Sequence, residues 1–87
     1  MQIEVAHLRT QGIDFAVFNA DAPSRSQPDR SALLARLVSV AQRNGLRVQK
    51  AALAFNEFGR PTFFGTPDLV RFLQTSGGFR WTHTLDI

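Results

Sequence analysis

The stretch Lys50-Ala-Ala-Leu-Ala-Phe-Asn-Glu-Phe-Gly-Arg-Pro-Thr-Phe-Phe-Gly-Thr-Pro-Asp-Leu-Val-Arg-Phe-Leu-Gln74 decides the fold of this chain. It predicts a strand, a turn over residues 56–59, a returning strand and a helix, and it holds five of the eight phenylalanines. Gly59 suits the left-handed position of the turn. Pro61 favours an edge position for the returning strand, because proline donates no ladder hydrogen bond. Thr66-Pro67-Asp68 combines a cap, a first-turn proline and an acid, and therefore starts a helix.

The residues before this stretch predict a β-hairpin. Residues 2–9 and 13–19 both alternate with a period of two, around the short turn Thr10-Gln11-Gly12. In the second strand we expect Ile13, Phe15 and Val17 to face inward. Asp14 and Ala16 are expected to face outward. The polar, proline-bearing residues 20–27 then form a loop.

A long helix follows this loop. It opens at Pro28-Asp29, with Ser26 or Gln27 as cap, and it stops at Asn44-Gly45. Its apolar positions recur at helical spacing and form one wide stripe, made of Leu33, Leu34, Leu37, Val40 and Ala41. Arg36, Ser39 and Arg43 face the opposite side.

Two further strands complete the prediction. Residues 46–55 predict a long strand whose alternation changes parity, which indicates a β-bulge near Gln49-Lys50. Residues 79–87 alternate again and predict a last strand after the helix end at Ser76-Gly77-Gly78.

The element order is therefore β-β-α-β-β-α-β, in a single α+β domain over residues 1–87. Strands joined by tight turns pair antiparallel. We expect one largely antiparallel sheet with both helices packed on one face.

Composition narrows the function classes. The chain of 87 residues is 44% hydrophobic and 20% charged, as in ordinary globular domains. It contains no cysteine, which removes disulfides, thiolate metal ligands and cysteine nucleophiles. The first residues lack the pattern of a signal peptide, and no apolar run approaches the ~20 residues of a membrane span. We expect a cytoplasmic protein that does not contact membranes.

The two histidines, His7 and His83, are the candidates for chemistry. Both occupy inward positions of predicted strands, so they approach each other if the first and last strands are neighbours, with Glu4 or Asp86 nearby. Such a pair suits general acid–base catalysis or metal binding. The alternative is two half-buried imidazoles that bond to local carbonyl groups. No phosphate-binding glycine loop, hydrolase serine motif or paired carboxylates accompany them, and we predict no cofactor and no metal site.

The basic residues are concentrated in one segment. Residues 25–50 carry six basic side chains against Asp29 alone, a local net charge of +5, whereas the whole chain carries +3. The candidates to contact nucleic acid or an acidic protein are Arg30, Arg36, Arg43, Arg47 and Lys50. The alternative is a solvated helix face, since no helix-turn-helix or RNA-binding aromatic motif occurs.

Three further residues suggest a protein interface. Phe58 lies at a predicted hairpin tip next to Arg60, and it either inserts into a partner or folds back over Pro61 or Phe63. Trp81 lies on the apolar face of the last strand. If that strand is an edge, pairing across a two-fold axis gives a homodimer.

We therefore expect a small regulatory or adaptor module that acts by binding rather than by catalysis. The alternatives are a small enzyme that uses His7 and His83, and a structural subunit of a larger assembly.

Overall fold

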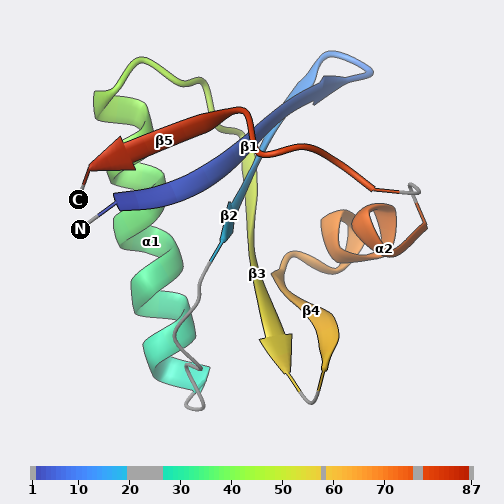
Figure 1. The fold of residues 1–87 in the computed structure, drawn as a ribbon. Coiled ribbons are helices and arrows are strands. Elements are labelled where there is room, and N and C mark those ends of the chain that lie inside the picture. Colours follow the sequence, from blue (N-terminus) through green and yellow to red (C-terminus); the bar gives the residue numbers. More distant parts are fainter. Residues whose placement is uncertain (1, 20–26, 58, 76–77, 87) are drawn as a thin grey trace.

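The structure is a computed structural model that describes residues 2–19, 27–57, 59–75 and 78–86. Its strands are β1 (Gln2–Thr10), β2 (Ile13–Asn19), β3 (Lys50–Glu57), β4 (Arg60–Gly65) and β5 (His83–Asp86). Its helices are α1 (Gln27–Arg43) and α2 (Pro67–Thr75). The α+β class and the order β-β-α-β-β-α-β are confirmed (Figure 1).

All five strands form one sheet in the order β4-β3-β2-β1-β5. The hairpin pairs β1–β2 and β3–β4 are antiparallel, as their short turns predict, and β5 returns antiparallel to β1. The pair β2–β3 is parallel, because α1 carries the chain back to the starting end of the sheet. The sheet is thus mixed, with both β4 and β5 at edges.

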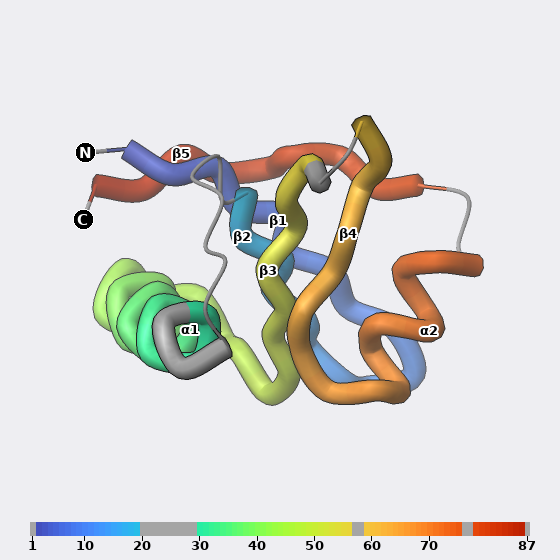
Figure 2. The backbone as a smooth tube through the Cα atoms, turned by 90° about the horizontal axis from the view of Figure 1, so that it is seen from below, coloured from blue at the N-terminus to red at the C-terminus, as the bar shows by residue number. Residues whose placement is uncertain are grey.

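The two helices cover opposite faces of the sheet, and the prediction that they share one face is wrong. Alternate residues of β2 divide between two apolar clusters: Phe18 packs with Leu37 of α1, and Val17 packs with Leu69 of α2. Figure 2 shows α1 and α2 on either side of β2 and β3. Asp14 and Ala16, expected to face outward, are therefore buried as well.

The third strand is shorter than predicted. It begins at Lys50, and residues 46–48 are irregular, so the change of parity needs no bulge. Leu46 and Val48 instead pack against the α1 cluster from the connection that follows the helix. The last strand is also shorter, because β5 begins at His83 instead of residue 79.

The local signals for the glycine turns and the helix ends are confirmed, although Asn56 and Glu57 of the turn predicted over residues 56–59 belong to β3. Helix α1 ends at Arg43, before the turn at Asn44-Gly45, and α2 begins at Pro67. Gly59 has a φ of 76°, the left-handed value that the hairpin turn requires. The predicted cap Ser26 lies outside the described residues.

One close approach fixes the β3–β4 pair. Gly65 lies opposite Ala52, and a Cβ atom at Gly65 would lie 2.7 Å from the Ala51 carbonyl oxygen and 2.9 Å from the Ala52 Cβ. Both contacts involve atoms on or next to the backbone of a central strand, so no flexible side chain relieves them. The end of β4 therefore requires glycine.

We predict that Gly65→Ala lowers the free energy of unfolding by about 1–3 kcal/mol, because β4 must shift away from β3. Urea denaturation of the variant and the parent checks this. Ser39→Ala, at an exposed position of α1, is the control and should change the free energy of unfolding by less than about 0.5 kcal/mol. A Gly65→Ala protein as stable as the parent would contradict the close packing described for this position.

Candidate functional site

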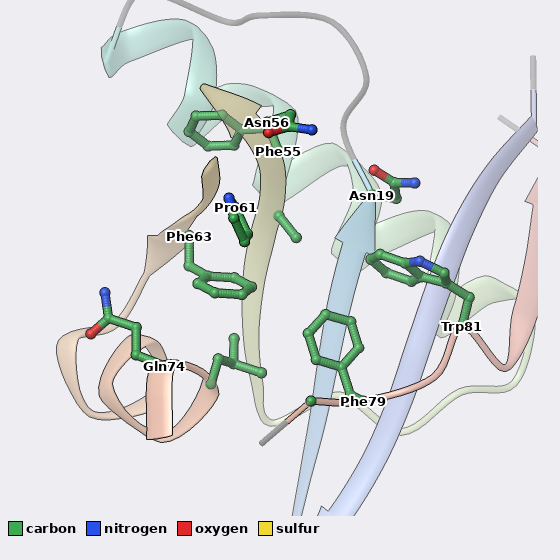
Figure 3. A pocket seen from close by; sticks show the side chains of 11 residues that line it. Asn19, Phe55, Asn56, Pro61, Phe63, Gln74, Phe79 and Trp81 are labelled. Carbon is green, nitrogen blue, oxygen red and sulfur yellow. The ribbon is translucent and has the colours of Figure 1, made fainter. Parts of the chain in front are cut away.

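An open, aromatic groove of about 590 Å³ lies where β3, β4, α2 and the segment 78–82 meet. Figure 3 shows Phe63 of β4 on one side of it and Phe79 and Trp81 on the other. Ala54 and Leu73 contribute apolar surface between them. The volume lies within the range of small-molecule sites, which are mostly apolar with a few polar groups.

Amide side chains supply the polar part of this aromatic groove. Asn19 ends β2, Asn56 lies near the end of β3, and Gln74 lies in the last turn of α2. Because β2 and β3 are parallel neighbours, their carboxyl ends lie at the same end of the sheet. Asn19 and Asn56 lie at these two strand ends. Ligands of sheets with parallel strands often bind at such carboxyl ends.

The segment 78–82 forms one wall of the aromatic groove because its two ends are held. At one end, Phe79 packs against the α2 cluster. At the other end, the Thr82 amide donates to the Val5 carbonyl at 2.8 Å, and the Thr82 hydroxyl accepts from the His7 amide at 3.0 Å. The hydroxyl takes the place of a backbone carbonyl in the β1–β5 ladder, so the strand ends and the chain leaves β1. This explains why residues 79–82 alternate like a strand but are irregular.

His7 and His83 meet, as predicted for neighbouring first and last strands, but His83 is exposed, so the inward position predicted for it is wrong. Their ring centroids are 6.2 Å apart in an edge-to-face arrangement. The His7 Nε2 donates to the Arg47 carbonyl at 2.9 Å, and it must carry the proton because a carbonyl only accepts. The His83 Nδ1 shares a 2.8 Å hydrogen bond with the Thr82 hydroxyl.

The carboxylate that contacts this histidine pair is Asp14, whereas the prediction named Glu4 or Asp86. Asp14 is 3% exposed, and its Oδ1 lies 3.5 Å from the His7 Nε2. Its Oδ2 has no hydrogen bond within the described residues, although Arg9 lies 3.6 Å away. The backbone of Asp14 bonds twice to Gln49, through the Gln49 amide and its side-chain oxygen.

These bonds fasten the connection between α1 and β3 to the sheet. His7 holds the carbonyl of Arg47, and Asp14 holds Gln49 two residues later. This geometry matches the alternative in which His7 is satisfied by a local carbonyl group. No group of three or more His, Asp or Glu side chains within the described ranges is placed to hold a metal ion.

The basic candidates do not form one stripe. Arg36 and Arg43 are exposed and border the same hollow on α1, together with Asp86. The Arg30 guanidinium lies 4.6 Å from the centre of the Phe55 ring instead. Arg47 is exposed, and its described contact is the backbone bond to His7.

Lys50 is engaged on the other side of the molecule. Its ammonium group forms an ion pair with Asp68, near the start of α2. The hydrogen bond from Lys50, helped by the Thr66 hydroxyl, lowers the pKa of Asp68 to about 2. Lys50 therefore does not extend the basic surface of α1.

The predicted interface residues are also separated. Phe58 lies outside the described residues. Arg60 is exposed at the start of β4, and Trp81, which is 37% exposed, lines the aromatic groove. Neither helix in the part of the chain that the structure describes is long and apolar enough to cross a membrane.

Comparison with known proteins adds no relative: no family model, no curated protein and no solved structure matches the chain. The candidate site therefore depends on geometry alone. Trp81 was predicted from the sequence, whereas Asn19, Phe63 and Phe79 were not, because only the tertiary fold brings these residues together. The available signal was Phe79-Arg-Trp81 directly after Gly77-Gly78, two aromatic side chains next to a break in the helix.

Proposed function

We propose that this protein is a small, non-catalytic binding module and that the aromatic groove is its ligand site. The observation that carries the proposal is the gathering of Phe63, Phe79 and Trp81 around one open groove of about 590 Å³. Trp81 keeps 37% of its surface exposed. A large aromatic ring exposed at the wall of a groove is a typical anchor for a bound partner.

The catalytic alternative with His7 and His83 has weaker support. Acid–base chemistry needs a ring nitrogen that exchanges its proton with a substrate, and the His7 Nε2 is bonded to the Arg47 carbonyl. We also infer a cytoplasmic location, in keeping with the absence of cysteine.

We predict that Nile red, an uncharged dye that fluoresces in apolar sites, binds the protein and that Trp81→Ala weakens this binding about three- to tenfold through the lost aromatic contact. Fluorescence titration gives the affinity of each variant. Arg80→Ala, at the exposed neighbour of Trp81, is the matched control and should bind like the parent. Equal affinity of Trp81→Ala and the parent would place the dye elsewhere, and no binding at all would also overturn the proposal.

A second binding surface is proposed on α1, where Arg36 and Arg43 border one hollow. Two exposed guanidinium groups suit phosphates of nucleic acid or carboxylates of an acidic protein. The separation of Arg30, Arg47 and Lys50 reduces the proposed surface to these two arginines.

We predict that the double variant Arg36→Ala, Arg43→Ala weakens binding to mixed-sequence single- and double-stranded nucleic acid. The slope of log affinity against log salt concentration should fall by the contribution of about two phosphate contacts. Fluorescence anisotropy at several salt concentrations measures both quantities. The double variant Arg71→Ala, Arg80→Ala removes the same charge from exposed positions elsewhere and serves as the control. Equal effects of the two double variants would reduce the contact to net charge and contradict a defined surface.

A homodimer is proposed through the outer edge of β5, which ends the sheet and, among the strands of the described residues, pairs with β1 alone. We predict a dimer mass for the parent at high micromolar concentration in sedimentation experiments. Thr84→Lys, at an exposed position of this edge, should give a monomer because lysine on an edge strand opposes pairing. A monomeric parent would rule out the dimer.

A further inference from the structure

The three rings of the aromatic groove meet at steep angles. Phe79 and Trp81 are 5.0 Å apart between centroids with ring planes at 88°, and Phe63 and Phe79 are 6.2 Å apart at 60°. A flat aromatic ligand stacks best between two nearly parallel rings. Figure 3 shows Phe63 on one side of the groove and Phe79 and Trp81 on the other, so a rounded group between them contacts aromatic rings from more than one direction.

The charged side chains near the aromatic groove lie beside its lining and not in it. No described residue that lines it is Asp, Glu, Lys or Arg. Its charged neighbours include the exposed Arg60 and Arg80, and Glu4, whose Oε1 accepts from Nδ2 of the lining residue Asn19 at 3.1 Å. Because a carboxylate only accepts, this bond also orients the Asn19 amide, with its NH₂ group toward Glu4. A bound anion would meet this carboxylate and no cationic side chain in the lining.

The protein already holds one cation against an aromatic ring beside this site, on the face of β3 that packs against α1. Phe55 lines the aromatic groove, and the guanidinium carbon of Arg30 lies 4.6 Å from the centre of its ring. Contacts between a cation and an aromatic face are strongest for cations that lose little hydration, such as alkylated ammonium groups.

We infer that the aromatic groove is a cage for an alkylated ammonium group, with Phe79, Trp81 and Phe63 as its walls and Glu4 as the nearby counter-charge. The inference rests on the proposed function and names the class of ligand for the same site. The ammonium group contacts the ring faces, and the amides of Asn56 and Gln74 are placed to bond polar parts of the same ligand.

Choline and 3,3-dimethylbutan-1-ol test this inference directly, because they have the same shape and differ in charge. We expect choline to bind and its neutral counterpart to bind about two- to thirtyfold more weakly, the range that a cation–π contact supplies. Calorimetric titration gives both affinities. The Trp81 side chain offers a second readout, since it is the one tryptophan in the sequence. Its indole NMR signal should shift when choline is added.

Two conservative variants separate charge from shape. Phe79→Leu keeps an apolar side chain but removes the π face, and Glu4→Gln removes the charge while keeping an oxygen that accepts from Asn19. Each should weaken choline binding severalfold and leave the affinity for 3,3-dimethylbutan-1-ol within about twofold. Asp86→Asn, which removes an exposed charge beside the α1 hollow, should change neither affinity.

The outcomes distinguish the inference from the proposed function. Equal binding of choline and 3,3-dimethylbutan-1-ol, or binding of neither while Nile red binds, overturns the cage and leaves the aromatic groove as a ligand site. Loss of Nile red binding as well overturns both. Choline binding that Phe79→Leu does not affect overturns the cage by placing the cation outside the rings.

Discussion

The burial of β2 on both of its faces is the constraint on which the rest of this structure depends. Ala16, Val17 and Phe18 are all fully buried, so each side of this strand needs its own apolar layer. α1 supplies one layer and α2 the other. A strand covered on both faces is typical of parallel β-α-β units, in which a helix returns the chain across the sheet. The parallel pairing of β2 with β3 and the burial of both faces of β2 are thus two features of one β-α-β arrangement.

This arrangement also creates the candidate site. The parallel strands β2 and β3 have their carboxyl ends at the same end of the sheet, where Asn19 and Asn56 lie. The aromatic groove opens there beside α2, and the segment 78–82 passes along it (Figure 3). Thr82 determines where this segment leaves β1, because its hydroxyl accepts the His7 amide in place of a ladder carbonyl. The strand expected from residue 79 therefore begins at His83, and the residues before Thr82 form the wall that carries Trp81.

Features encoded over a few residues could be predicted from the sequence. The helix start at Pro67, the helix stop at Asn44-Gly45 and the left-handed Gly59 follow from local backbone preferences. The meeting of His7 and His83 followed from strand parity together with an adjacent first and last strand. The side of the sheet that each helix covers could not be predicted in this way, since it depends on which face of β2 each apolar stripe meets. The short run Phe15-Ala-Val-Phe18, apolar throughout, was the available sign of a strand buried on both faces.

The aromatic groove could not be predicted from the sequence for a related reason. Its walls come from β4, α2 and the segment 78–82, and their approach depends on the packing of two layers. Its most direct test is a map of backbone amide and indole NMR shifts against a fragment library containing neutral, cationic and anionic members. We predict that the largest shifts caused by the neutral and cationic fragments fall on Ala54, Phe63, Phe79 and the Trp81 indole. Shifts that these fragments concentrate on Arg36 and Arg43, or around His7 and His83, would contradict the aromatic groove as the ligand site.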